Sequence, residues 1–249
     1  MRLDFEITNG VLVKYNGKDE YVGIPDGVTE IGRYAFMENK RITDVILPKG
    51  CKKIGHSAFA YCKRLNRVYI PDTVTEIQNA AFYECDRLES IELPPNLTVL
   101  PENIFCACKK LRWVKFPQNL LMISANAFMG CSSLQSVDLP CSVETIASFA
   151  FGHCAKLQEV KLPNGLKTIG NGAFKYDEQL TMIDIPKSVD YIGEQAFFNI
   201  GATRMEIPRG IHFVAKNAFG ANAKMQVIWP DDMPRPNVIG NMCFYDWLD

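Results

Sequence analysis

Several features that define common protein classes are missing from this sequence of 249 residues. It contains three histidines, and its 27 basic and 28 acidic residues leave a formal net charge of −1. No stretch approaches the roughly 18 to 20 consecutive apolar residues of a membrane-spanning helix. The balanced charge creates no overall field that would attract a nucleic acid or an anionic membrane surface. We therefore expect no nucleic-acid partner and no membrane span.

A secretion signal is also missing from the amino terminus. Met1 leads into Arg2, Asp4 and Glu6, whereas a signal peptide has a basic segment followed by an apolar run. As written, the sequence predicts a cytoplasmic protein. A secreted or cell-surface protein is the alternative if a targeting segment has been removed.

Catalytic constellations are missing as well. The histidines His56, His153 and His212 fall in turn regions far apart, so none has a second histidine for a metal site or a nearby nucleophile for a triad. Cys106-Ala107-Cys108 is a single close pair with no partner pair. No glycine-rich loop ends in Lys-Ser or Lys-Thr, as a phosphate-binding loop would. We expect a protein that is not an enzyme and has no metal or cofactor.

What the sequence does have is one pattern repeated along nearly its whole length. Phenylalanines recur at steps of 23 residues, and prolines repeat the same count independently before closing with steps of 22. Such a sustained period predicts a solenoid, in which each unit contacts only its neighbours. The phenylalanines are Phe36, Phe59, Phe82, Phe105, Phe128, Phe151, Phe174 and Phe197, followed after 22 residues by Phe219.

Each repeat has three parts. The segment Leu65-x-x-Val68-x-Ile70-Pro71 predicts a short strand that ends where proline removes the backbone donor. Val74-x-x-Ile77 predicts a second extended piece, and residues 79–85 predict a helical turn. We expect the strands of successive repeats to pair in parallel as one long sheet. Glycine often follows the second extended piece, which suggests a turn with unusual backbone angles; these glycines are Gly32, Gly55, Gly170 and Gly193.

The whole unit, with its Pro, Ala-Phe and Cys columns, resembles the 23-residue BspA-like class of leucine-rich repeats found in bacterial surface and secreted proteins. The resemblance covers about residues 20–230 and weakens in the last repeats, where Ala202 and Lys224 replace the leucine of the strand. It implies an α/β solenoid, a right-handed superhelix with a parallel β-sheet on its concave side and short helical turns on its convex side. It also implies adhesion or protein binding rather than catalysis.

The two ends of the chain depart from the repeat. Residues 3–24 alternate in polarity around Asn9-Gly10, a strong hairpin signal, so we predict an N-terminal β-hairpin cap over residues 1–27. The solenoid then covers residues 28–230, and a C-terminal cap covers residues 231–249. Aromatic residues within 243–248 are expected to cover the last coil. The alternative is that this segment docks onto a partner or onto a second copy of the chain.

Five of the nine cysteines occupy one position of successive repeats, three residues after the phenylalanine. They are Cys62, Cys85, Cys108, Cys131 and Cys154, and Asn39 and Asp177 hold the same position at the two ends of the column. We interpret the column as small apolar thiols packed beneath a turn. Nothing in it requires disulfide bonds or an oxidising compartment.

Candidate binding residues lie on the solvent side of the predicted strands. Trp113 is expected to stand there on a central strand, where an indole is a plausible binding anchor. Charges alternate in sign along one column from Glu92 to Asp184, which either neutralises the face or gives it electrostatic specificity for a partner. The seven candidates are Arg67, Tyr69, Trp113, Lys115, Glu159, Lys161 and Met182.

The sequence thus supports two functional hypotheses. In the first, the protein is a recognition module that binds a protein partner through its concave face, with a glycan as the less favoured ligand. In the second, it is a structural or self-assembling protein that associates through its terminal aromatic segment or its flanks.

Overall fold

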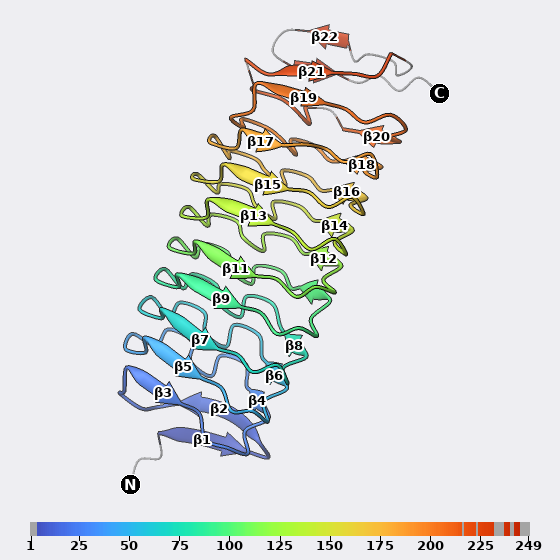
Figure 1. Cartoon of the computed structure of the whole chain (residues 1–249). Coiled ribbons are helices and arrows are strands. Elements are labelled where there is room, and N and C mark those ends of the chain that lie inside the picture. The colour runs from blue at the N-terminus through green and yellow to red at the C-terminus, as the bar shows by residue number, and fades with distance from the viewer. Residues whose placement is uncertain (1–3, 216, 223, 232–236, 240–241, 245–249) are drawn as a thin grey trace.

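The protein is a single stack of coils, seen in a computed structural model that describes residues 4–215, 217–222, 224–231, 237–239 and 242–244 (Figure 1). Each repeat forms one coil, and the strands labelled β1 and β22 lie at opposite ends of the stack. The repeat period and its assignment to a solenoid are therefore confirmed.

Each coil contains one longer strand on the side of the stack that Figure 1 labels β3 to β21. These strands are parallel and in register, so that Val45 pairs with Val68 and Val137 with Val160. Each central residue points inward because side chains alternate across a strand. The strands are β3 (Tyr21–Gly23), β5 (Asp44–Ile46), β7 (Arg67–Tyr69), β9 (Ser90–Glu92), β11 (Trp113–Lys115), β13 (Ser136–Asp138), β15 (Glu159–Lys161), β17 (Met182–Ile183), β19 (Arg204–Glu206) and β21 (Gln226–Ile228).

These longer strands do not form the one long sheet that the sequence predicts. They fall into four short parallel sheets, namely β3-β5-β7, β9-β11, β13-β15-β17 and β19-β21. Stacking therefore continues across each break while strand pairing does not. The breaks lie between β7 and β9, between β11 and β13, and between β17 and β19.

A second set of short parallel strands runs along the stack. It comprises β4 (Glu30–Ile31), β6 (Lys53–Ile54), β8 (Glu76–Ile77), β10 (Val99–Leu100), β12 (Met122–Ile123), β14 (Thr145–Ile146), β16 (Thr168–Ile169), β18 (Tyr191–Ile192) and β20 (Phe213–Val214). Its only interruption among the described residues lies between β8 and β10. In coils on either side, the residue after the strand donates its N–H to the previous coil, as Gln78 does to Ile54 at 2.9 Å. The equivalent residue after β10 is Pro101, which has no N–H to donate.

The first coil is covered by an antiparallel pair, β1 (Phe5–Thr8) and β2 (Val11–Tyr15). Strand β2 then pairs in parallel with β4, so that it continues the short-strand sheet. Leu12 and Tyr15 are buried, and the Tyr15 ring lies 5.1 Å from that of Phe36. The hairpin thus shields the end of the phenylalanine stack from water.

At the other end, β22 (Asn237–Ile239) and β23 (Met242–Phe244) form an antiparallel pair. Most of the aromatic segment predicted to cap the last coil, including Tyr245 and Trp247, lies outside the described residues.

The predicted helical turns are wrong, because the described residues contain no α-helix. Each turn instead has two residues in the left-handed region. One lies two positions before the phenylalanine and the other two positions after it, as Ala80 (φ 58°) and Glu84 (φ 53°) do around Phe82. Left-handed residues interrupt an α-helix, since they redirect the next peptide group. Because of these angles, every second amide of the turn points toward the next coil. The Phe82 N–H, for example, donates to the Ile104 carbonyl of that coil at 3.0 Å.

The core is a continuous column of stacked rings. All eight phenylalanines from Phe36 to Phe197 are almost completely buried. Neighbouring rings stack with centroid separations between 4.9 and 5.6 Å. This spacing follows from the distance between paired strands, about 4.8 Å, which is close to the separation that offset aromatic stacking prefers.

The cysteine column is made of buried free thiols, as the sequence predicts. Each thiol donates a hydrogen bond to the phenylalanine carbonyl of the preceding coil, at sulfur–oxygen distances from 3.0 to 3.3 Å. Burial raises the pKa of these thiols, to about 12 for Cys62. They therefore remain protonated and serve as hydrogen-bond donors between coils.

The glycines that follow the short strands have a different role from the one expected. The φ angles of Gly32, Gly55, Gly170 and Gly193 lie outside the left-handed region. A Cβ atom at Gly55 would instead lie 2.8 Å from the Ile31 carbonyl oxygen and from the Arg33 nitrogen of the preceding coil. Close approach of the coils excludes a side chain at Gly55, rather than an unusual backbone angle.

Candidate binding surface

The outward side chains of the longer strands β3 to β21 form one continuous surface, here called the strand face. The residues on either side of each inward residue point to solvent, which places all seven candidate residues on this surface. Trp113, Tyr69 and Met182 are exposed to 50%, 52% and 53%. Apolar side chains exposed singly are normal on a protein surface, whereas contiguous apolar patches mark interaction sites, so the arrangement of these residues decides what the surface can bind.

A first hollow of about 450 Å³ opens beside the break between β7 and β9. Arg67 and Tyr69 line it from β7, Ser90 and Glu92 from β9, and Trp113 closes it from β11. The structure thus brings three of the candidates together around one depression. Because β7 and β9 are not paired, the hollow sits where the sheet itself is open.

The charged side chains of the first hollow differ in whether they have an ion-pair partner. Lys115 Nζ lies 3.1 Å from Glu92 Oε2, so the acidic side chain of the hollow already has a cationic partner. Among the described residues, the Arg67 guanidinium has neither an ion pair nor a hydrogen bond with another side chain. Its charge therefore remains available in a hollow that two aromatic rings also line, so a partner there could offer it a carboxylate or a ring face.

A second hollow of about 460 Å³ lies beside the break between β17 and β19. It gathers three of the other four candidates, Glu159, Lys161 and Met182, together with Asp184 and Arg204. Arg204 NH2 lies 2.6 Å from Glu206 Oε1, so its charge is partly compensated at the rim. The candidates therefore form two groups on one face, and Lys115 lies beside the first group, on the same strand as Trp113.

Trp113 also borders a third, smaller hollow of about 130 Å³ at the break between β11 and β13. Phe116, Phe128 and Leu134 form its apolar wall, and Ser136 and Asp138 its polar rim. Each break in the longer-strand sheets is thus accompanied by a hollow, and Trp113 stands between two of them.

The alternating charges form a shorter ladder than the sequence predicts. Of the column from Glu92 to Asp184, only Glu92 and Lys115 form an ion pair among the described residues. Asp138 and Lys161 are register partners on β13 and β15 without such a pair. An exposed pair of this kind contributes about 0 to 1 kcal/mol, so the ladder leaves most of its charges open to solvent.

Two apolar residues of the strand face were not among the candidates. Tyr21 on β3 is exposed to 75%, and Ile46 on β5 to 55%. Ile46 is the register partner of Tyr69, so the two side chains are neighbours on adjacent strands. Both residues occupy the outward columns of the repeat, which was the available signal, and they extend the apolar part of the face toward the amino terminus.

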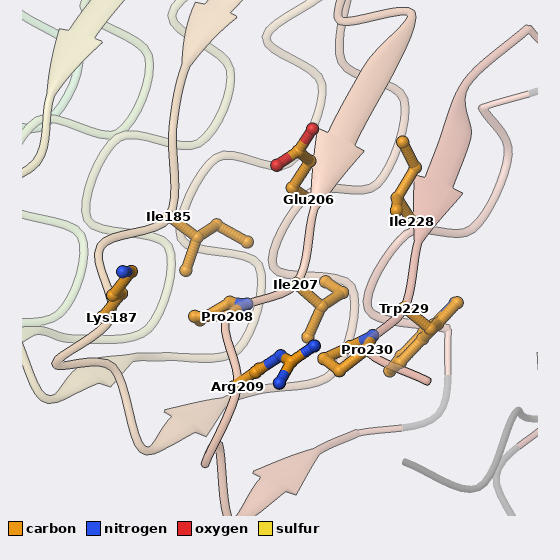
Figure 2. A pocket seen from close by; sticks show the side chains of 9 residues that line it. All are labelled: Ile185, Lys187, Glu206, Ile207, Pro208, Arg209, Ile228, Trp229 and Pro230. Carbon is orange, nitrogen blue, oxygen red and sulfur yellow. The ribbon is translucent and has the colours of Figure 1, made fainter. Parts of the chain in front are cut away.

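A further hollow of about 400 Å³ lies near the carboxyl end of the stack, where β19 and β21 lead into Pro208 and Pro230 (Figure 2). Ile185 and Ile207 contribute apolar side chains to its lining, and Trp229 lines the far side. The sequence did not single it out, because its residues belong to the regular apolar and proline columns.

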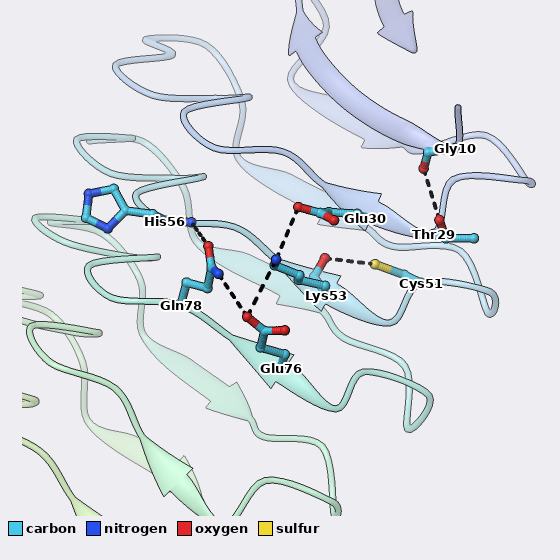
Figure 3. A network of polar contacts seen from close by, with 8 residues as sticks. All are labelled: Gly10, Thr29, Glu30, Cys51, Lys53, His56, Glu76 and Gln78. Atoms are coloured by element: carbon cyan, nitrogen blue, oxygen red, sulfur yellow. Dashed lines mark hydrogen bonds and ion pairs between the residues drawn. The ribbon is translucent and has the colours of Figure 1, made fainter. Parts of the chain in front are cut away.

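On the short-strand side, the amino-terminal coils carry a network of ion pairs and hydrogen bonds. Lys53 on β6 lies 3.6 Å from both Glu30 on β4 and Glu76 on β8 (Figure 3). Gln78 Nε2 donates to Glu76 Oε1 at 2.8 Å, and Gln78 Oε1 accepts the His56 N–H at 3.0 Å. This network joins neighbouring coils, with one lysine shared between two glutamates and the Gln78 amide as a further donor to Glu76.

Two classes of site do not appear in the part of the chain that the structure describes. It contains no group of three or more His, Cys, Asp or Glu side chains placed to hold a metal ion. It also contains no helix with the length and hydropathy needed to cross a membrane.

A repeated sheet of this kind with an exposed apolar and charged face defines a leucine-rich-repeat scaffold. The family of BspA type leucine rich repeat regions, in six copies, matches residues 14–132 and 99–226. Because these matches span most of the sequence, the chain belongs to this family. Such repeats form scaffolds that are generally non-enzymatic and typically serve in protein interaction or adhesion.

Solved bacterial structures share the fold. A leucine-rich repeat protein of T. pallidum, TpLRR, is 29% identical, with a TM-score of 0.56 over 83% of this chain and 88% of its own. One from Eubacterium ventriosum is 25% identical, with a TM-score of 0.64 over 79% of this chain and 62% of its own. The pneumococcal vaccine antigen PcpA is 20% identical over 90% of this chain and 76% of its own, with a TM-score of 0.52, and shows likeness of fold alone. Among curated protein sequences, none matches the chain.

Proposed function

We propose that this chain is a non-catalytic recognition module that binds a protein partner through the strand face. The observation that carries the proposal is the half-exposed Trp113 indole, which stands between two hollows on a surface of paired strands. Covering such a ring removes a large apolar area from water, and tryptophan is among the residues most often found to dominate binding energy.

The scaffold favours binding because the face is ordered before the partner arrives. Backbone hydrogen bonds join each coil to the next, and the phenylalanine stack fixes their spacing. Little conformational entropy is then lost when the partner docks. The middle strands of the first and second hollows, β9 and β17, are four coils apart, which corresponds to about 20 Å at the usual strand spacing. A partner that contacts both must present an extended surface.

The two hollows would contribute in different ways. In the first hollow, the rings of Tyr69 and Trp113 offer an apolar surface and Arg67 a positive charge. In the second, Glu159 and Lys161 offer charges of opposite sign, and Met182 offers an apolar side chain. Lys115 belongs to the side of the first group, because it lies on the strand of Trp113 and pairs with Glu92 of the first hollow. A glycan is the less favoured ligand because the face mixes charges of both signs with aliphatic side chains. Self-association through residues 243–248 stays a prediction, since most of that segment lies outside the described residues.

An affinity capture with matched variants tests the proposal. The intact chain and a Trp113→Ala/Tyr69→Ala variant are each used to capture proteins from cell lysate and from surface extracts. Leu121→Ala/Tyr191→Ala is the control, because these side chains are exposed to 46% and 37% on the short-strand side. We expect one protein to be retained by the intact chain and the control and to be lost, by roughly 30-fold or more in affinity, from the strand-face variant.

Circular dichroism and thermal unfolding establish that the three proteins are equally folded. Retention of the same protein by all three would place the binding surface elsewhere. Loss only from the control would move it to the short-strand side.

A further inference from the structure

One residue in the core interrupts the cysteine column and has unusual surroundings. Asp177 takes the cysteine position in the coil of Phe174, and none of its surface is exposed to solvent. Its Oδ1 atom accepts the N–H of Cys154 in the preceding coil at 2.7 Å. Its Oδ2 atom is buried and has no hydrogen-bond partner among the described residues. A buried ionised oxygen left in this way would be strongly destabilising.

The Phe151 carbonyl next to Asp177 lacks the hydrogen-bond donors that the equivalent carbonyls have. In the regular coils the phenylalanine carbonyl accepts two hydrogen bonds, as Phe128 does from the Cys131 N–H at 3.0 Å and from the Cys154 thiol at 3.3 Å. Phe151 has lost both of these donors. The Cys154 N–H turns to Asp177 instead, and Asp177 stands where the next thiol would be. The Phe151 carbonyl therefore needs a donor from the Asp177 position.

A second place in the same stack shows how a side chain of this shape resolves the problem. Asn222 occupies the cysteine position two coils further on, and its Oδ1 accepts the Ile200 N–H at 2.9 Å, as Asp177 Oδ1 accepts that of Cys154. Its Nδ2 donates to the Phe197 carbonyl at 2.6 Å. Asparagine and aspartic acid have the same shape, so Asp177 Oδ2 corresponds to a donor that faces the Phe151 carbonyl.

We propose that Asp177 is protonated in the folded protein and that its Oδ2–H group donates to the Phe151 carbonyl, so that a proton holds these two coils together. A neutral carboxyl group then makes the same two hydrogen bonds to the preceding coil as the Asn222 amide, which has a second N–H and also donates to the Phe219 carbonyl of its own coil at 3.0 Å. The direction of the pKa agrees, because burial raises the pKa of Asp177 well above its usual range and the hydrogen bond from Cys154 opposes this only in part.

The ionisable groups around Asp177 do not supply a compensating positive charge. The Cys154 thiol of the preceding coil is buried, and burial raises its pKa as well. His153 and Tyr176 pack against each other on the turns, with ring centroids 4.8 Å apart. The charged side chains on the surface of these turns bond to residues other than Asp177. Lys175 Nζ donates to Gln195 at 2.5 Å, and Glu178 accepts from Asn199 at 2.9 Å.

This arrangement makes the stability of the junction fall as pH rises above the unfolded pKa of an aspartate, about 3.9. The folded pKa of Asp177 lies above its unfolded value of about 3.9, so the proton is held more tightly in the folded state. The stabilisation is complete below the unfolded pKa and is lost as pH rises toward the folded pKa. Within that window Asp177 raises the unfolding equilibrium constant by up to about tenfold per pH unit.

Reciprocal substitutions at the two equivalent positions test the proposal. Unfolding in urea is followed between about pH 5 and pH 9 for the intact protein, Asp177→Asn and Asn222→Asp. Asp177→Asn keeps both hydrogen bonds without a proton, so we expect a more stable protein at neutral pH and a smaller loss of stability with rising pH. Asn222→Asp should do the opposite, with lower stability and a new loss as pH rises.

Two further measurements keep the test decisive. Asp177→Cys restores the thiol column and serves if Asp177→Asn does not fold. Infrared difference spectra of the intact protein and the Asp177→Asn variant, with carbon-13 in the aspartates, should show the carbonyl band of one neutral carboxylic acid. An unchanged pH dependence in both Asp177 variants, or a carboxylate band alone at neutral pH, would overturn the assignment.

Discussion

Replacing Phe105 with alanine is expected to lower the free energy of unfolding by about 3 to 5 kcal/mol. Phe105 is fully buried, and its ring lies between those of Phe82 and Phe128 at centroid separations of 5.6 and 5.4 Å. Removing the ring leaves a cavity at the middle of the stack and takes a partner from two neighbours. Because coils of a solenoid are stabilised only by their neighbours, the two halves should also unfold less cooperatively.

Urea unfolding of the purified protein measures this loss. Phe213→Ala is the matched control, since this ring also stacks, on Tyr191 at 4.9 Å, but is exposed to 37% on the outside. We expect the control to cost about 1 kcal/mol or less. Equal losses for the two variants would mean that the phenylalanine column is not the main source of stability.

The cysteines should differ in reactivity on the order of a thousandfold. Cys141 is exposed, whereas Cys62 is fully buried and its pKa is raised by burial to about 12. The thiolate is the reactive form, and each unit of pKa lowers its fraction about tenfold near neutral pH. Iodoacetamide should therefore modify Cys141 long before any thiol of the column.

A time course analysed by peptide mass spectrometry gives the rate for each cysteine, and the same reaction in urea provides the control in which the rates converge. Rapid modification of Cys62 or Cys108 in the folded protein would contradict the buried column. So would the isolation of a disulfide between neighbouring column cysteines.

The repeat made much of this fold predictable. The Leu-x-x-Val-x-Ile-Pro segment around Val68 identified the longer strands through its alternation of inward and outward residues, and Val74-x-x-Ile77 identified the short ones through buried residues at a fixed spacing in every repeat. The buried Phe82 and Cys85 followed from the same columns. Each of these features depends on local alternation and on the period, which the sequence states directly.

The turns were not predictable in the same way. Ala80 and Glu84 take left-handed angles although neither is glycine or asparagine, and the residues around them suit a helical turn by composition alone. The hydrogen bonds that compensate these angles come from the next coil, as between Phe82 and Ile104. Stacking of whole coils therefore overrode the local preference, and a single repeat does not contain that information.

The candidate surface was predicted in its residues but not in its arrangement. The outward columns placed Tyr69, Trp113 and Met182 on one face, yet the two hollows depend on which strands fail to pair. The break in the short-strand sheet follows from Pro101, which the sequence shows plainly. Asp177 was visible only as the end of the cysteine column, because its role depends on the Phe151 carbonyl and on the parallel with Asn222.

Site-specific photocrosslinking tests most directly whether the strand face is the binding surface. A benzophenone amino acid is placed at Ile46, which is exposed beside Tyr69 without being one of the proposed anchors, and in a second protein at Tyr191 on the short-strand side. Both proteins are irradiated with the extracts used for capture. The proposed function predicts that the captured partner crosslinks from position 46 and not from position 191. Crosslinking from position 191 alone would contradict it.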